Sequence, residues 1–251
     1  MKIKFILSKL ENLFFNITPP FYLTAVMLGF LTILPIIFSP YIDKKNDEYK
    51  ISLMQDTMRL NKLSLEVHEK NKIITDHQNI LITNYALQQS SAKRLSSKER
   101  IELAYIITEQ AHLHNLDPLL VIALIQVEST FNPYAQSHKG AKGLMQLLPD
   151  TALYINKKTD KGIPENNNLF DAKTNIALGT AYMEYLLNKT NGNLEYALAA
   201  YNMGPANIFR AKRENRVPKA YSNKVLKEYA KLQKAVYTIS IAQKQQISKL
   251  Y

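Results

Sequence analysis

The sequence of 251 residues predicts an all-α protein that is organised around one buried helix and preceded by an apolar N-terminal segment. Apolar residues recur at helical spacing through most of the chain, and capping residues stand where helices are expected to begin. The alternation of apolar and polar residues that is typical of strands does not extend beyond a few residues. A hairpin within residues 138–168 would be too short for this pattern to reveal. The length suits one domain of about 100–150 residues with appended elements.

Residues 21–39 form an apolar stretch of nineteen residues without a charged side chain. A helix of this length approaches the hydrocarbon thickness of a bilayer, about 30 Å. A cleaved signal peptide is the alternative, but its apolar part is usually about 7–15 residues long and ends in small residues. The stretch instead ends in Phe38-Ser39-Pro40, a poor cleavage site, so a retained transmembrane anchor is favoured.

Basic residues do not decide the orientation of this anchor. Three lysines precede the anchor, Lys2, Lys4 and Lys9, and three follow it, Lys44, Lys45 and Lys50, so the counts on the two sides are equal. The side on which such residues are more numerous normally faces the cytoplasm, and here neither side has more.

Residues 40–95 are expected to form a helical stalk or linker. Glycine and proline are scarce in most of this segment, and apolar residues recur at gaps of three, four and seven: Leu60, Leu63, Val67, Ile74 and Leu81. Lys70 and His77 interrupt this heptad-like pattern, which therefore fits a stalk or a weak self-association helix better than a long coiled coil. The stalk could contact a second copy or another protein partner. A solvated linker helix without a partner is an equally good interpretation.

The main domain is expected to occupy residues 96–235, and its helices are predicted from their caps. Ser96 and Glu99 form a capping-box signature, and Asp117, Asp171 and Asn193 precede three further apolar repeats. A last amphipathic helix is predicted from an apolar stripe of Val225, Tyr229, Leu232, Val236 and Ile239. Residues 236–251 are expected to form a basic C-terminal tail.

Composition excludes several kinds of site. Cysteine is absent, which excludes disulfides, thiolate metal sites and lipid attachment to an N-terminal cysteine. The five histidines lack the spacing of metal ligands, so neither a metal nor a cofactor is expected. Much of the net charge of +11 lies in residues 205–251, which could contact anionic headgroups or cell-wall carboxylates, or simply form a solvated helix face. Nucleic-acid binding would need stacking aromatics among these basic residues. Tyrosines are present there (Tyr221, Tyr229, Tyr237 and Tyr251), but Tyr229 belongs to the apolar stripe of the last helix, and nucleic-acid binding is not expected.

Glu128 is the candidate catalytic residue. Residues 118–127, PLLVIALIQV, are apolar almost all round, as in a central buried helix. An acid in the last turn of such a helix is desolvated and lies at the negative end of the helix dipole, and both effects raise its pKa. A carboxyl group still protonated near neutral pH can act as a general acid, and as a base once ionised. Taken alone, a helix-end carboxylate that turns to solvent or pairs with a lysine is an equally good interpretation.

Two later segments add polar groups and turns. Residues 131–133, Phe-Asn-Pro, stop the helix, and Gly140 and Gly143 permit turns, so the chain is expected to loop back over the acid. Residues 144–148 are then expected to enter another helical stretch. Further on, Tyr201 and Asn202 place a phenol and an amide together at a helix terminus.

Together and in this order, these motifs resemble a known family, the lytic transglycosylases related to the catalytic domain of the soluble enzyme (SLT type), which have a goose-type-lysozyme-like fold. The resemblance covers about residues 97–230. It lies in Glu128-Ser129, in Ser137 with Gly140-Ala141 and Gly143-Leu144-Met145-Gln146, in Ala200-Tyr201-Asn202 with Gly204, and in Tyr221 after Pro218. Two departures, Met203 in place of a small residue and Ala172 in place of proline, do not touch the chemistry.

The resemblance implies a role for each matching residue. Glu128 would be the sole catalytic acid and base, because no second acid accompanies it in the motifs. The other matching residues would bind substrate: Ser129 and Ser137 near the scissile sugar, Gly143, Leu144, Met145 and Gln146 in the groove wall, Tyr201 and Asn202 lining the cleft, and Tyr221 closing it.

The resemblance also implies a substrate and a location. The substrate would be the glycan strands of peptidoglycan, cleaved between N-acetylmuramic acid (MurNAc) and N-acetylglucosamine (GlcNAc) with formation of 1,6-anhydroMurNAc ends and without a metal or cofactor. Because peptidoglycan lies outside the inner membrane, segment 1–20 would be cytoplasmic and the catalytic domain periplasmic. Two alternatives remain: a hydrolytic muramidase of the same fold, and a non-catalytic peptidoglycan-binding module of a wall-spanning secretion machine.

Overall fold

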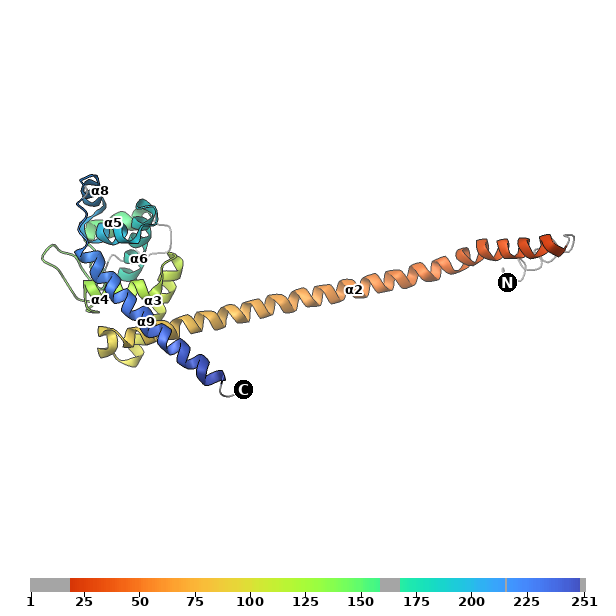
Figure 1. Ribbon diagram of the computed structural model, residues 1–251, viewed down its shortest axis with the longest axis horizontal. Coiled ribbons are helices and arrows are strands. Elements are labelled where there is room, and N and C mark those ends of the chain that lie inside the picture. Colours follow the sequence, from red (N-terminus) through yellow and green to blue (C-terminus); the bar gives the residue numbers. More distant parts are fainter. Residues whose placement is uncertain (1–18, 159–167, 215, 249–251) are drawn as a thin grey trace. The chain divides into compact units, whose positions relative to one another are not determined.

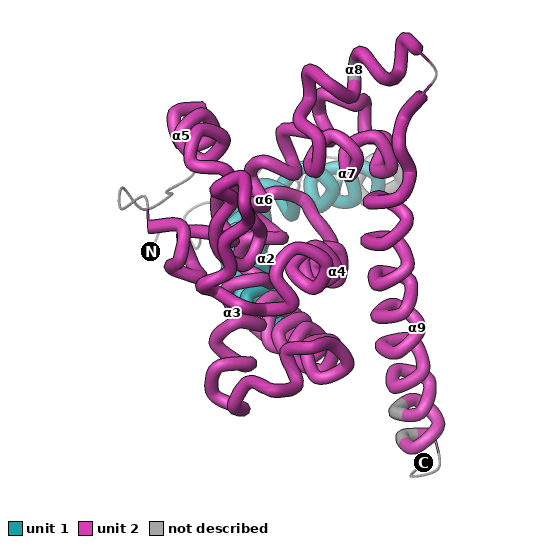
Figure 2. Tube along the Cα trace, turned by 90° about the vertical axis from the view of Figure 1, so that its left-hand side faces the viewer, with its two compact units in different colours: residues 1–71 teal, residues 72–251 magenta. Residues whose placement is uncertain are grey.

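The computed structural model describes residues 19–158, 168–214 and 216–248. Helices dominate this described part, and its only extended pairing consists of isolated β-bridges from Gln136 to Lys142 and from Lys142 to Leu147. The predicted all-α class is therefore confirmed (Figure 1). The chain divides into two compact units, residues 1–71 and 72–251, which are coloured separately in Figure 2. Residues 1–18 of the predicted cytoplasmic segment and the last three residues of the predicted tail lie outside the described residues.

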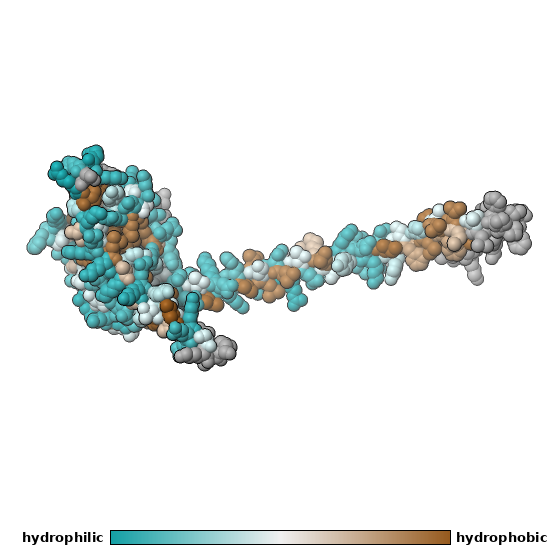
Figure 3. Space-filling view, in the orientation of Figure 1, coloured by the Kyte–Doolittle hydropathy of each residue, from teal (hydrophilic) through white to brown (hydrophobic). Residues whose placement is uncertain are grey.

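The described part of the first unit belongs to one long helix, α2 (Pro19–Gln88), whose last residues belong to the second unit. The helix contains a window that is long and apolar enough to cross a membrane, near the N-terminus. Side chains there are exposed, and Leu31 and Ile36 keep 71% and 73% of their surface. Figure 3 shows the apolar residues gathered toward the N-terminal end of the described helix. The predicted apolar helix preceding a helical stalk is thus present.

The second unit is a bundle of helices of different lengths around α4. Its further elements are η1 (Ser91–Arg94), α3 (Ser97–Leu113), α4 (Pro118–Glu128), α5 (Pro149–Lys158), α6 (Ala172–Lys189), α7 (Leu194–Met203), α8 (Pro205–Arg213) and α9 (Ala220–Ser248). Every residue of α4 from Leu119 to Ile125 is buried, because α3 and α9 pack against this helix. This explains the continuous apolar run, since a helix covered on all sides has no face for charged residues.

The predicted caps are confirmed. The hydroxyl of Ser96 accepts a hydrogen bond from the Glu99 backbone, and the Glu99 carboxylate accepts one from the Ser96 backbone, which completes the capping box. Asp117, Asp171 and Asn193 each accept a backbone N–H in the first turn of α4, α6 and α7. These side chains satisfy amide groups that a helix start leaves without partners, so the helices begin where the sequence indicates.

The structure corrects one element and adds two features. Residues 144–148 do not form the expected helical stretch but a tight turn, in which Gln146 has a φ of 48° and Lys142 bridges to Leu147; α5 begins only at Pro149. The sequence analysis did not identify the basic helix α8. The core of the second unit also contains side chains from the end of the expected stalk segment, because Ala86, Leu87 and Ala92 are fully buried.

Candidate active site

Glu128 lies at the C-terminal end of α4, where the buried helix opens toward a cavity. Burial raises the pKa of its carboxyl group to about 7, and a hydrogen bond from Tyr221 partly opposes this shift. The phenol of Tyr221, on α9, donates this bond to Oε1 of Glu128. The expected rise in pKa is therefore present, with desolvation as its main cause. Near neutral pH, a substantial fraction of Glu128 carries a proton that it can donate.

The loop after α4 returns over the acid, as expected. Within it, the hydroxyl of Ser137 accepts a hydrogen bond of 3.0 Å from the Ala141 backbone, and the Ser137 backbone N–H donates to the Ala141 carbonyl at 2.9 Å. The side-chain amide of Gln146 donates to the carbonyl oxygens of Ala135 and Gly143 at 2.9 and 3.0 Å. These bonds fix the loop that borders Glu128, so the cavity wall is formed before any ligand binds.

Asn175, a residue that the sequence analysis did not single out, holds this loop against α6. Its side chain is fully buried; Oδ1 accepts a bond of 2.7 Å from the Met145 backbone, while Nδ2 donates to the carbonyls of Lys142 and Leu169 at 2.9 Å. A polar side chain inside the apolar repeat of α6 was the available signal, because a buried amide needs hydrogen-bond partners. Asn175 thus positions the loop without contacting the cavity.

Tyr201 connects the same loop to α7. Its hydroxyl donates to the Met145 carbonyl at 2.8 Å, and its ring is buried. Burial and the nearby charge of Glu128 raise the pKa of the Tyr201 phenol well above its usual value. The next residue, Asn202, is exposed, and α7 ends at Met203, followed by the capping residue Gly204 with a φ of 85°. The helix terminus therefore presents an amide beside the acid, as the sequence indicated.

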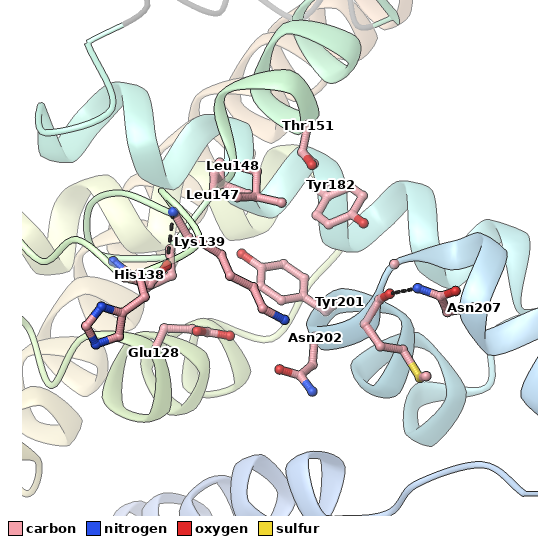
Figure 4. A pocket seen from close by; sticks show the side chains of 15 residues that line it. Glu128, His138, Lys139, Leu147, Leu148, Thr151, Tyr182, Tyr201, Asn202 and Asn207 are labelled. Carbon is pink, nitrogen blue, oxygen red and sulfur yellow. Dashed lines mark hydrogen bonds between the residues drawn. The ribbon is translucent and has the colours of Figure 1, made fainter.

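Two cavities meet at Glu128. The larger has a volume of about 710 Å³ and the smaller about 490 Å³, and Glu128, Asn202 and Met203 line both. Figure 4 shows the larger cavity, with Glu128 near one side and Thr151 at the other. Among the described residues that line the two cavities, Glu128 is the only acid, whereas Lys139 and Lys224 contribute positive charge. The site is thus a groove that extends to both sides of one carboxyl group, whose pKa is raised to about 7.

The structure brings six of the ten predicted site residues together in this groove. The larger cavity is lined by Glu128, Ser137, Gln146, Tyr201 and Asn202, and the smaller by Glu128, Asn202 and Tyr221. The other four do not line it. Ser129 is buried and its hydroxyl donates to the Ile125 carbonyl at 3.3 Å, while Gly143, Leu144 and Met145 lie in the turn beneath the surface.

Several lining residues were missed by the sequence analysis. Thr151 on α5 and Tyr182 on α6 line the larger cavity together with Lys139 and Asn207, and Lys224 on α9 lines the smaller. Lys139 lies in the same loop as Ser137, whereas the other four lie on separate helices and belong to no local motif. Only the packing of the helices brings them to the groove.

Comparisons with known proteins find a family and several relatives to which this chain is similar. Residues 105–224 match the family described as Transglycosylase SLT domain. The membrane-bound lytic murein transglycosylase C of Salmonella arizonae is 37% identical over 114 residues, which cover 42% of this chain and 32% of that protein. The soluble lytic murein transglycosylase of Salmonella typhimurium is 34% identical over 116 residues, 44% of this chain and 18% of the relative. The aligned part thus spans a third or less of these curated relatives.

Two solved structures are also similar. Lytic transglycosylase Slt from Pseudomonas aeruginosa, an inactive mutant, is 29% identical with a TM-score of 0.41 over 56% of this chain and 24% of that one. The 70-kDa soluble lytic transglycosylase from Escherichia coli is 23% identical with a TM-score of 0.42, over 64% and 27%. Residues 105–224 of this chain are thus similar in sequence to the transglycosylase SLT domain family.

Proposed function

We propose that this chain is a membrane-anchored peptidoglycan lytic transglycosylase that cleaves the MurNAc-β-1,4-GlcNAc bond with Glu128 as its single acid and base. The observation that carries the proposal is a carboxyl group with a pKa of about 7 at the junction of two cavities. A groove on both sides of the acid can hold sugars on both sides of the cleaved bond. The names of the curated relatives, lytic murein transglycosylases, support the same substrate and reaction.

In the proposed reaction, protonated Glu128 donates its proton to the glycosidic oxygen while the bond from MurNAc C1 to this oxygen breaks. GlcNAc leaves as the alcohol, and the acetamido carbonyl of MurNAc stabilises the positive charge at C1. The carboxylate of Glu128 then accepts the proton of the MurNAc 6-hydroxyl as O6 attacks C1. This closes the 1,6-anhydro ring and returns Glu128 to its protonated form, so one carboxyl group performs both proton transfers.

Digestion of purified sacculi tests the proposal. The muropeptides that the protein releases are separated and weighed by mass spectrometry, which distinguishes anhydro ends from reducing ends. Anhydro ends are expected. Reducing ends would instead identify a hydrolytic muramidase, and binding to sacculi without any release would identify a non-catalytic wall-binding module.

Replacing Tyr221 with phenylalanine is expected to move the pH dependence of the reaction. The hydrogen bond from Tyr221 lowers the pKa of Glu128, so its loss should raise this pKa above its value of about 7. The acid then stays protonated to higher pH, and the alkaline limb of the activity profile should shift upward. Tyr237→Phe changes an exposed tyrosine of the same helix and should leave the limb in place. A downward shift in Tyr221→Phe would contradict this account of the site.

For the location, we propose that residues 21–39 cross the inner membrane and that the catalytic domain, residues 96–235, lies in the periplasm. Exposed leucine and isoleucine side chains in the first part of α2 support insertion in lipid, since water does not favour such a surface. In the same proposal, residues 40–95 form the stalk between the membrane and the catalytic domain, and residues 236–251 form a basic tail. The membrane-bound relatives agree with an anchor.

We further propose that the stalk pairs with the stalk of a second copy. Within the first unit, one stripe of α2 at gaps of four and three contains no charged residue: Leu53, Thr57, Leu60, Ser64, Val67 and Asn71. The charged residues of this stretch all lie off the stripe, together with apolar residues such as Met58 and Leu65: Asp56, Arg59, Lys62, Glu66, Glu69 and Lys70. Leucine and valine at every seventh position, alternating with uncharged polar residues, suit a parallel two-stranded pairing. Anchors in one membrane would hold two copies parallel and raise their effective concentration.

The absence of cysteine from the sequence makes this pairing testable in the full chain. Val67→Cys places a thiol on the uncharged stripe, and Glu69→Cys places one on the opposite face of the same turn. Mild oxidation of membranes is expected to give a disulfide-linked dimer for Val67→Cys and little for Glu69→Cys, as measured on a non-reducing gel. Equal yields from the two variants, or no dimer from Val67→Cys, would disprove the pairing.

A further inference from the structure

The acid-bearing end of α4 is held by the short helix η1, which follows α2 in the chain. Residues 118–127 contain one polar side chain, Gln126, and it forms two hydrogen bonds with Ser91 at the start of η1. The backbone N–H of Ser91 donates to Gln126 Oε1 at 2.9 Å, and Gln126 Nε2 donates to the Ser91 hydroxyl at 3.0 Å. Because a polar side chain in a buried helix needs partners, this pair explains why a glutamine can interrupt the apolar run.

Gln126 and Glu128 lie on nearly opposite faces of α4, because residues two apart in a helix do not face each other. Figure 4 shows the side chain of Glu128 pointing into the larger cavity, which Gln126 does not line. Ser91 thus holds the last turn of α4 from the face opposite the acid, while Tyr221 contacts the acid itself from α9. The carboxyl group is therefore fixed from two sides.

A second contact from η1 holds the turn that follows the acid. Thr130 and Phe131 have φ angles of 50° and 62°, in the left-handed region that residues with a side chain rarely adopt. Phe131 is buried, and the guanidinium group of Arg94 donates a hydrogen bond to the Thr130 carbonyl. These contacts offset the energetic cost of the backbone conformation, so the turn and the adjoining end of α4 depend on them.

η1 is itself fixed by contacts with the core. The Ser90 hydroxyl accepts a hydrogen bond from the Ala92 backbone at 3.1 Å and donates one to the Leu87 carbonyl at 2.7 Å. Leu87 and Ala92 are fully buried in the core of the second unit. η1 is therefore an ordered support against which α4 is held.

We propose that the contacts of η1 position the catalytic acid: Ser91 acting through Gln126, and Arg94 acting through the turn after α4, set where the carboxyl group lies in the groove. This group has to reach both the glycosidic oxygen and the 6-hydroxyl, and a misplacement of about 1 Å can reduce a rate on the order of a hundredfold. Ser91 and Arg94 precede the residues that match the SLT family, 105–224, and neither lines a cavity at Glu128. The catalytic machinery thus begins within the segment expected to be stalk. This inference rests on the proposed function, because it takes Glu128 to be the acid.

Steady-state kinetics of the full chain on soluble glycan chains prepared from sacculi test this inference. Gln126→Met keeps the length of the side chain and removes both hydrogen bonds to Ser91, so kcat is expected to fall by roughly ten- to a hundredfold. KM should stay nearly constant, because no contact with the glycan is lost. The pH profile should also change: as the end of α4 loosens, water reaches Glu128 and its pKa falls from about 7 toward the ordinary value of 4.5. The alkaline limb of the profile should then move to lower pH.

Three further variants grade the effect. Arg94→Ala should lower kcat in the same way, whereas Arg94→Lys keeps a charged donor and should restore most of it. Ser91→Ala removes only the hydroxyl and retains the bond from the backbone N–H, so its loss of kcat should be smaller than that of Gln126→Met. It is also the deciding variant if Gln126→Met does not fold. The matched control is Gln88→Met, which changes an exposed glutamine at the end of α2 and should leave both kcat and the alkaline limb in place.

The outcomes separate this inference from the proposed function. If the η1 variants keep the kcat and the pH profile of the unmodified protein, the positioning role is refuted, while release of anhydro ends would still support the reaction. A rise in KM at unchanged kcat would also refute it. So would a loss of activity that is equal at every pH and follows a lower thermal midpoint, because this loss would reflect unfolded protein alone. If the unmodified protein releases no product from sacculi, the proposed function itself fails, and this inference fails with it.

Discussion

Glu128→Gln is expected to abolish release of muropeptides from sacculi, with turnover falling by about 10²- to 10⁴-fold or more, the range for loss of a general acid. The amide has nearly the shape of the carboxyl group but cannot donate a proton of suitable acidity or accept one back. Since Glu128 is the only acid among the described residues that line the two cavities, no neighbour can substitute for it. Product release measured against time provides the test.

The matched control is Glu109→Gln, which changes an exposed acid on α3 and should keep full activity. In the unmodified protein, activity should fall as pH rises through about 7, because the proton donor is then lost. A Glu128→Gln protein with full activity would remove Glu128 from the mechanism and with it the proposed reaction.

The same substitution should stabilise the protein at alkaline pH. The folded-state pKa of Glu128 lies above its ordinary value of 4.5, so the folded state binds this proton more tightly than the unfolded chain does. Stability is therefore lost as pH rises from the ordinary value through about 7, by an amount on the order of 3 kcal/mol. Glutamine does not ionise, so Glu128→Gln should unfold at a higher temperature than the unmodified protein above pH 7, and the difference should vanish in acid.

Gly143→Ala is expected to destabilise the catalytic domain by about 3 kcal/mol or more, or to prevent folding. A methyl group at this position would lie 2.1 Å from the Leu169 carbonyl oxygen and 2.3 Å from Nδ2 of Asn175, and the backbone has a φ of 80°. The Leu169 oxygen belongs to the backbone and cannot rotate away. The turn over the acid would have to move, and the hydrogen bonds that Asn175 makes to it would break.

Gly140→Ala is the matched control, because its φ of 81° is nearly the same while no atom lies within 4 Å of the added methyl group. It should cost only the strain of the backbone, about 1 kcal/mol. Denaturant unfolding of both variants measures the difference. Equal destabilisation would show that backbone strain alone, rather than the close approach of α6, determines the requirement for glycine at 143.

Local interactions explain how much of the fold could be predicted. A cap such as Asp117 or Ser96 acts within its own first turn, so the start of a helix is visible in a few residues. The long apolar run of α4 likewise predicted burial of the helix and a raised pKa for the acid at its end. Features that depend on one short segment were therefore predicted correctly.

Features that depend on distant segments were not. The turn at residues 144–148 looked helical from its apolar residues, but Asn175, thirty residues later, supplies the hydrogen bonds that hold it in another conformation. Thr151, Tyr182 and Lys224 reach the groove only through the packing of α5, α6 and α9. The helix α8 was overlooked because its basic residues lack a long apolar repeat.

The hydrogen bond between Tyr221 and Glu128 also limits where the catalytic proton can travel. Burial and the neighbouring carboxylate hold the pKa of the Tyr221 phenol far above its usual value, and Tyr201 is affected in the same direction. Neither phenol can release a proton at any pH that a cell experiences. Among the described residues beside Glu128, these two phenols therefore do not take the proton as ionised groups, and the proposed reaction returns it to the carboxyl group from the 6-hydroxyl of the sugar.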